Sequence, residues 1–187
     1  KKNIIICPSG IRSVSEISTK YSIENKYIDC LVYFKKRDPK ELQLVENFLN
    51  KRGLSYKILK YGDYKQKELS MLSKVSKFGF ILNKTESQGF ATQYLMSENL
   101  PLVVWDYPFN FYEGFKIKST SVPWWDDYKC GIRSSTIEEL EKNFDDFFLN
   151  IKNYSPAEYV QEKLTYEVYS ENLLSIFNSK LWPIQNK

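Results

Sequence analysis

Short runs of apolar residues alternate with amphipathic stretches along most of the chain. Residues 28–34 are almost continuously hydrophobic, which is typical of a strand buried on both faces of a parallel sheet. Asp38, Pro39 and Glu41 then combine an N-cap, a proline at the first helical position and a capping-box glutamate. The pattern therefore predicts a strand followed by a helix, which Gly53 ends.

The same strand-and-helix unit recurs. A capping box of Asp63 and Gln66 is expected to open the second helix, and Thr136 with Glu139 a later one. Further strands are predicted at 56–59, 78–82, 102–105 and 130–133. Further helices are predicted at 90–99 and 137–151, after a cap at Ser155 to Glu158, and at 165–177. Alternation with short connections predicts a parallel sheet with helices on both faces. We therefore expect one Rossmann-like three-layer α/β/α domain over residues 1–187.

Two stretches do not fit this alternation. A short apolar run at 3–7 precedes Pro8, and residues 106–130 are predicted to be irregular although they are rich in aromatic side chains. A loop this long inside a compact domain is usually functional or covers a site. It is interpreted as a lid on the core, an interface patch or a ligand wall, and the pattern does not separate these three.

Composition and charge narrow the class of partner. The chain has 187 residues, 42% hydrophobic and 27% charged, with 14 Tyr and 12 Phe, which is typical of one globular domain with a large core. The net charge of +4 comes from lysines scattered among glutamates rather than from a basic stripe. We therefore expect no nucleic acid partner, whereas a small polyanion suits the charge. No stretch has the length of a membrane span or the pattern of a signal peptide.

The absence of histidine excludes whole classes of mechanism. With no histidine, Ser-His, Cys-His and His-metal chemistry are excluded within this chain. Cys7, Cys30 and Cys130 are odd in number and widely spaced, which fits neither a zinc site nor a disulfide framework. The sequence predicts reduced thiols, a cytoplasmic location, no bound metal and no cofactor.

The loop before the predicted helix at 90–99 carries the clearest candidate chemistry. Gly89 and Phe90 begin this helix, and free backbone N–H groups at a helix N-terminus favour an anion. Glu86 lies in the same loop, where its carboxylate can accept hydrogen bonds from sugar hydroxyls. Lys36 and Arg37 follow the first strand and are expected to be exposed cations that neutralise a diphosphate without a metal ion.

Simpler interpretations of the same residues remain open. Lys35, Lys36 and Arg37 can be a solvated charge cluster, and Ser87 can be an ordinary N-cap beside Glu86. Only the occurrence of these residues together, in this order within successive strand-and-helix units, favours a ligand-binding role over these simpler interpretations.

The stretch from Glu86 to Ala91, followed by residues 99–106, resembles the signature of the retaining GT-B glycosyltransferases known as family 4 or group 1. The turn at 61–63 is similar to that family's turn before the base pocket, and residues 31–37 are similar to its first strand with terminal basic residues. Similar segments also occur at 123–124, 130–131 and 138–140. The resemblance runs from Pro8 to about residue 150 and covers the C-terminal half of such an enzyme, in a version lacking one strand-and-helix unit.

The resemblance implies a nucleotide-sugar donor, a glycan acceptor and transfer with retention of configuration. It also implies an N-terminal lobe that binds the acceptor and on which the helices at about 155–180 pack. By the resemblance Glu86 is the catalytic residue. The diphosphate would be held by Lys36, Arg37, Gly89 and Phe90, and the nucleoside by Gly62, Asp63, Tyr64 and Tyr94.

Tyr94 stands where the family has a second glutamate that binds the ribose hydroxyls. A phenol makes fewer hydrogen bonds to two neighbouring hydroxyls than a carboxylate does. Ribose is then held differently, or the domain is a degenerate, non-catalytic binding or scaffold module. An unrelated flavodoxin-like nucleotide or signalling domain is a further alternative, although no acidic phospho-acceptor or flavin loop is evident in the sequence.

Overall fold

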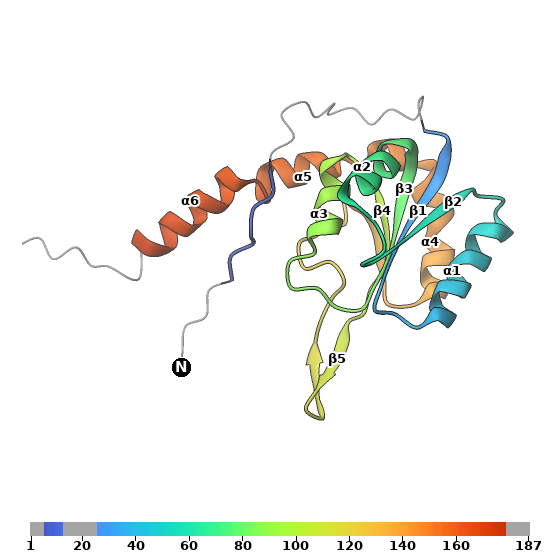
Figure 1. Cartoon of the computed structure of the whole chain (residues 1–187), viewed down its shortest axis with the longest axis horizontal. Helices are drawn as coiled ribbons and strands as arrows, with labels where there is room; N and C mark the ends of the chain where they lie inside the picture. The colour runs from blue at the N-terminus through green and yellow to red at the C-terminus, as the bar shows by residue number, and fades with distance from the viewer. Residues whose placement is uncertain (1–5, 13–25, 179–187) are drawn as a thin grey trace, which may run out of the picture.

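The computed structural model describes residues 6–12 and 26–178 and confirms the predicted α/β architecture (Figure 1). A five-stranded parallel sheet has the order β2-β1-β3-β4-β7. Its strands are β1 (Ile28–Lys35), β2 (Tyr56–Lys60), β3 (Ser76–Asn83), β4 (Leu102–Trp105) and β7 (Gly131–Ser134). All five strands were predicted, because each is a short apolar run between helix signals.

Helices cover both faces of this sheet, as Figure 1 shows. The helices are α1 (Pro39–Lys51), α2 (Gln66–Val75), α3 (Phe90–Ser97), α4 (Ile137–Leu149), α5 (Pro156–Lys163) and α6 (Tyr166–Ile176), with a 3-10 turn at Ile151–Asn153. Buried side chains of α1 and α4 pack on one face, and those of α2, α3 and α5 pack on the other. The domain is therefore three-layered.

The sheet separates two hydrophobic cores. On the α1 and α4 face, edge-on phenylalanine pairs include Phe48 with Phe144, at 4.9 Å between ring centroids, and Phe78 with Phe147, at 5.9 Å. On the α2 and α3 face the core is mainly aliphatic and includes Tyr33. Because side chains alternate across a strand, successive residues of β1 enter different cores.

Helix starts were predicted with mixed success. The capping box of α1 is present, with Asp38 accepting from the Lys40 backbone and Glu41 accepting from the Asp38 N–H. The capping box predicted at Asp63 is wrong, since α2 begins after Lys65 without a side-chain cap. The Asp63 N–H instead bonds the Lys60 carbonyl at 3.0 Å. That bond closes the turn after β2, so the chain enters the helix two residues later.

The N-termini of α4 and α5 also differ from the predicted caps. Thr136 caps α4 by accepting from the Glu139 N–H, as predicted, but the Glu139 carboxylate accepts from the Ser134 hydroxyl. The side chain of Ser155 makes no cap hydrogen bond to the α5 backbone, and its hydroxyl donates to Glu158.

The prediction that residues 106–130 are irregular is wrong for 109–118, whereas 119–130 contain no helix or strand, as predicted. Strands β5 (Phe109–Tyr112) and β6 (Phe115–Lys118) form an antiparallel hairpin that projects from the domain in Figure 1. Its two-residue turn has positive φ at Glu113 (48°) and at Gly114 (82°), which is the backbone of a type I′ turn. Glutamate is an unusual first residue for this turn, so the sequence lacks the Asn-Gly or Asp-Gly signal.

The described segment 6–12 lies beside the junction of α5 and α6. The Ile11 N–H donates to the Leu164 carbonyl at 2.8 Å, and the Tyr166 N–H donates to the Ile11 carbonyl at 3.0 Å. Helix α5 packs on α3 within this domain, whereas no residue of α6 is buried. Most of the predicted apolar run at 3–7, and the chain beyond residue 178, lie outside the described residues.

Candidate functional site

The strand order identifies the edge of the sheet at which a ligand is expected. The connection from β1 leads outward to β2, and the chain then crosses over β1 to β3. Ligands of open parallel sheets bind at the carboxyl ends of the strands where the winding direction reverses, here between β1 and β3. The same order occurs in flavodoxin-like domains.

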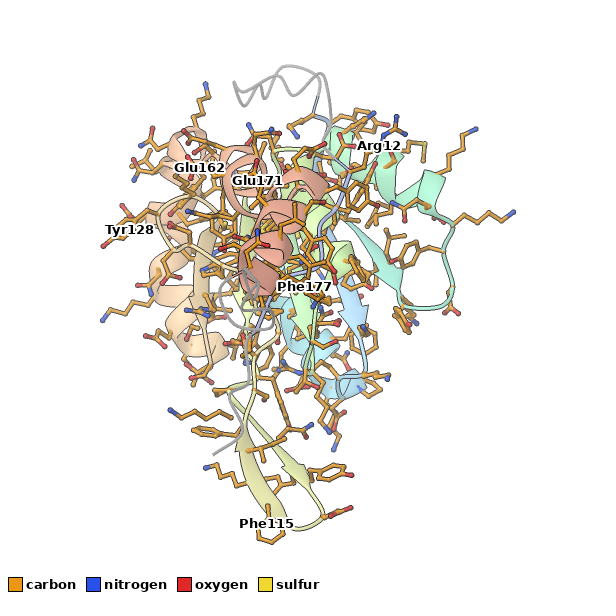
Figure 2. All side chains as sticks on the ribbon, turned by 90° about the vertical axis from the view of Figure 1, so that its left-hand side faces the viewer. Arg12, Phe115, Tyr128, Glu162, Glu171 and Phe177 are labelled. Carbon is orange, nitrogen blue, oxygen red and sulfur yellow. The ribbon has the colours of Figure 1, made fainter. Side chains whose placement is uncertain are left out.

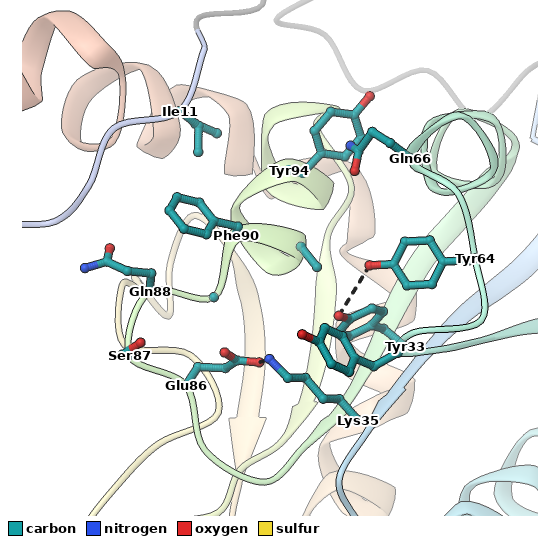
Figure 3. A pocket seen from close by; sticks show the side chains of 13 residues that line it. Ile11, Tyr33, Lys35, Tyr64, Gln66, Glu86, Ser87, Gln88, Phe90 and Tyr94 are labelled. Carbon is teal, nitrogen blue, oxygen red and sulfur yellow. Dashed lines mark hydrogen bonds and ion pairs between the residues drawn. The ribbon is translucent and has the colours of Figure 1, made fainter.

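A cleft of about 420 Å³ lies at this point. It is lined by Tyr33 and Lys35 of β1, by the turn after β2, by residues 86–91 and by Tyr94 of α3 (Figure 3). This volume lies in the range of small-molecule sites. We call it the β1–β3 cleft.

The N-terminus of α3 opens onto the β1–β3 cleft. Gly89 is its N-cap with φ 72°, and no side chain in the described part of the chain caps it. Ser87 is therefore not the N-cap, in contrast to the simpler interpretation. First-turn N–H groups of a helix have no intrahelical partner, and they favour an anion. Gly89 and Phe90 thus lie where the sequence analysis expected them.

A partly buried ion pair lies in the cleft. Lys35 Nζ lies 2.6 Å from Glu86 Oε1, and the two side chains are 16% and 11% exposed. The same oxygen accepts from Asn83 Nδ2 at 3.3 Å. Lys35 also lies 4.5 Å from the centre of the Tyr61 ring. The cleft thus holds one cation and one carboxylate that neutralise each other.

Tyrosines form the wall on the β2 side. The Tyr64 hydroxyl donates to the Tyr33 hydroxyl at 3.4 Å, and their rings pack edge-on at 5.9 Å. Burial, followed by this hydrogen bond, raises the pKa of Tyr33 well above its ordinary value. Tyr33 therefore stays a neutral phenol, and this wall offers aromatic surface and hydroxyls rather than charge.

Tyr94 borders the cleft with its ring. Its hydroxyl donates to Oε1 of Glu98, the C-cap of α3, at 2.8 Å, and Figure 3 shows it pointing away from Glu86. Burial raises the pKa of Tyr94. The phenol is thus already partnered by its own helix.

Arg37 does not lie in the β1–β3 cleft, and the expectation that it is an exposed loop charge is wrong. Its guanidinium donates to both Glu41 carboxylate oxygens at 2.7 Å and to the carbonyls of Asn83 and Trp105 at 2.9 Å. It also lies against the rings of Trp105 and Tyr107, at 5.0 and 5.1 Å. The residue is only 7% exposed. Arg37 is therefore a structural residue, and its hydrogen bonds connect the end of β1 with the ends of β3 and β4.

Lys36 is exposed, with a positive φ of 54°, and lines a second cleft of about 410 Å³ with Arg37, Lys40 and Lys84. The structure therefore separates Lys36 and Arg37 from Glu86. Gly62 and Asp63 are exposed in the turn after β2, where Tyr61 and Tyr64 rather than these two residues line the β1–β3 cleft.

The sequence analysis missed Lys35 as the cation of the cleft. Strand parity is the signal that finds it, because Leu31, Tyr33 and Lys35 share one face of β1. Leu31 and Tyr33 enter the core beneath α2 and α3, so Lys35 emerges on the side of the α3 N-terminus. This alternation identifies Lys35 only once it is known which helices cover each face of the sheet.

The described residues hold neither a candidate metal cluster nor a membrane-spanning helix. No cluster of three or more histidine, cysteine, aspartate or glutamate side chains there could hold a metal ion. None of the helices of 26–178 is long and apolar enough to cross a membrane. Neither a protein-family model nor a curated protein matches this chain.

Proposed function

We propose that this chain is the donor-binding lobe of a GT-B-type glycosyltransferase and binds a nucleotide-sugar in the β1–β3 cleft. The sugar would pass to a glycan acceptor with retention of configuration, as the sequence resemblance implies. One observation carries the proposal. A helix N-terminus without a side-chain cap, a lysine and a carboxylate meet in one cleft at the reversal point of a parallel sheet.

The Lys35–Glu86 pair suggests how the donor is received. A diphosphate at the α3 N-terminus brings two negative charges beside Lys35, and it competes with Glu86 for the ammonium group. Once Lys35 turns to the diphosphate, the carboxylate is free to accept hydrogen bonds from sugar hydroxyls. Lys35 then takes the role that the sequence analysis gave to Lys36 and Arg37, and it stabilises the leaving diphosphate without a metal ion.

The nucleoside would lie against the tyrosine wall. Tyr61 and Tyr64 come from the turn after β2, and Tyr94 of α3 lines the same cleft. Because the Tyr94 hydroxyl is bonded to Glu98, stacking rather than a hydrogen bond to ribose is the role we propose for Tyr94.

The proposed function also requires an acceptor-binding lobe and a cellular compartment. An N-terminal lobe would supply the acceptor site, and α6, with Leu174 and Phe177 exposed, is the helix we propose to pack on it. Free Cys7, Cys30 and Cys130 accord with a reducing compartment, so we propose that the enzyme works in the cytoplasm.

Two alternatives rest on specific observations. Tyr94, in place of a carboxylate, favours a degenerate lobe that binds no nucleotide. The strand order favours a flavodoxin-like domain, for which flavin mononucleotide is the natural ligand. Both are distinguished by a ligand panel of UDP, GDP, dTDP, their sugar conjugates and flavin mononucleotide.

Neighbouring lysines offer a matched test of the site. Lys35→Met and Lys36→Met remove the same charge one residue apart, but only Lys35 lines the β1–β3 cleft. We expect Lys35→Met to weaken nucleoside diphosphate binding about tenfold or more, the loss of one charge-assisted contact, and Lys36→Met to leave it unchanged. Equal losses, or a loss only for Lys36→Met, would contradict the assignment. Glu86→Gln should impair binding of the sugar conjugate but retain the bare diphosphate.

A further inference from the structure

The β5–β6 hairpin carries the most exposed cluster of aromatic side chains in the described chain. Phe111, Tyr112 and Phe115 are 69%, 65% and 73% exposed at its tip. Figure 2 shows Phe115 at the far end of this projection. Exposed aromatic clusters of this kind mark interaction sites, and the β1–β3 cleft uses none of them.

The apolar residues lie on both faces of the hairpin. In the antiparallel register Phe109 pairs with Lys118 and Phe111 with Lys116, so these four side chains share one face. Tyr112, Phe115 and Ile117 lie on the opposite face. A protein partner with a single flat surface covers only one face, whereas a fluid lipid phase surrounds the tip on all sides.

Charge also favours an anionic lipid surface. Lys116 and Lys118 are exposed among the aromatic residues, and Glu113 is the single acidic residue between positions 107 and 120. Lys40 and Lys84 lie near the base of the hairpin, where Lys84 Nζ is 5.6 Å from the Tyr107 ring. Lysine is depleted in protein–protein interfaces, but lysine and aromatic residues together favour membrane interfaces.

The base of the hairpin is held firmly. The Asp106 carboxylate accepts from the N–H groups of Tyr107 and Ser121 at 2.8 and 2.6 Å, and from the Thr120 hydroxyl at 2.9 Å. Both legs of the hairpin are thus tied to the end of β4. Four residues per strand at about 3.4 Å each reach roughly 14 Å, which is long enough to cover the depth of about 5–10 Å that interfacial segments occupy.

We propose that the β5–β6 hairpin inserts its aromatic tip into the interface of an anionic lipid membrane, with Lys116 and Lys118 at the headgroups. The hairpin leaves the same sheet edge as the β1–β3 cleft, and the Glu86 N–H bonds the Thr120 carbonyl at 3.0 Å. Insertion therefore holds the mouth of the cleft beside the membrane surface. The proposal does not depend on which ligand the cleft binds.

Vesicle flotation of the full chain tests this proposal. We expect binding to vesicles containing phosphatidylglycerol and much weaker binding to pure phosphatidylcholine. The double variant Phe111→Ser/Phe115→Ser should lose at least about tenfold in partitioning, because two rings leave the apolar phase. The matched control, Tyr128→Ser/Leu149→Ser, removes side chains 91% and 82% exposed elsewhere on the surface, and it should bind like the wild type.

Charge variants give effects of opposite sign. Lys116→Gln and Lys118→Gln should each weaken binding to anionic vesicles about fivefold, while Glu113→Gln should strengthen it. Failure of the wild type to float with anionic vesicles would overturn the proposal, as would equal losses in the control variant. A lipid-free dimer that the Phe111→Ser/Phe115→Ser variant abolishes would assign the hairpin to a second copy of the chain and overturn it too.

Discussion

Replacing Arg37 by methionine should destabilise the fold strongly, although a charged residue after a strand would ordinarily be replaced at little cost. The variant keeps the apolar stem but removes four hydrogen bonds, two to Glu41 and two to the carbonyls of Asn83 and Trp105. The contacts with two aromatic rings are lost as well. Asn83 and Trp105 end β3 and β4, and Glu41 lies in the first turn of α1.

The expected loss follows from burial. Removing one partner of a buried ion pair costs about 3–5 kcal/mol. The Glu41 side chain is 25% exposed, against 2% for Arg37, so water can rehydrate the carboxylate left behind. Asn83 also keeps a second donor, because the Ser121 hydroxyl lies 2.8 Å from its carbonyl. We therefore expect Arg37→Met to lower the free energy of unfolding by about 2–4 kcal/mol.

Urea unfolding followed by circular dichroism measures this loss as a shift of the midpoint at unchanged slope. The exposed neighbour supplies the control, since Lys36→Met should change stability by no more than about 0.5 kcal/mol. A double-mutant cycle with Glu41→Gln then isolates the ion pair. An Arg37→Met variant as stable as Lys36→Met would refute the structural role and return Arg37 to the solvated cluster.

Three further predictions concern other parts of the fold. Gly131→Ala should cost more than about 3 kcal/mol or prevent folding, because a Cβ there would clash with the Leu102 carbonyl oxygen. The control Gly53→Ala meets no atom within 4 Å and should cost about 1–2 kcal/mol for its left-handed backbone. Burial raises the pKa of Cys130 from 9.0 to about 12 and also raises the pKa of Cys30. The unfolded chain therefore loses these protons first, and stability should fall above about pH 9. Cys130→Ala should remove part of this slope in urea titrations at about pH 8 to 10.5. In nucleotide titrations Tyr94→Phe should bind like the wild type and Tyr94→Ala should bind more weakly, and a weakening by Tyr94→Phe would contradict the stacking role.

The regular parts of the domain were predictable because their signals are local. Strand β1 is a nearly continuous apolar run, and Asp38, Pro39 and Glu41 determine where α1 begins. The hairpin was missed because its signal is weak. Glu113-Gly114 is an uncommon type I′ pair, and aromatic residues on both faces hide the period-two pattern of a half-buried strand.

The candidate site was predicted only in part, since it depends on tertiary contacts. The loop from Glu86 to Phe90 lies in the cleft because one short segment supplies both the carboxylate and the helix start. The sequence analysis expected Lys36 and Arg37 to supply the positive charge of the cleft, whereas the adjacent Lys35 lines it. Which of Lys35, Lys36 and Arg37 faces α3 depends on strand parity and on the helices that cover each face, and neither is evident from a cluster of charges.

A calorimetric titration of the unmodified chain with UDP, GDP and dTDP tests the central claim most directly. The claim is that the β1–β3 cleft binds a nucleoside diphosphate at the α3 N-terminus beside Lys35. The account predicts saturable binding of at least one of the three at one site per chain, weakened by added salt because the contact is between charges. Absence of heat with all three, together with an unchanged melting temperature in their presence, would contradict it.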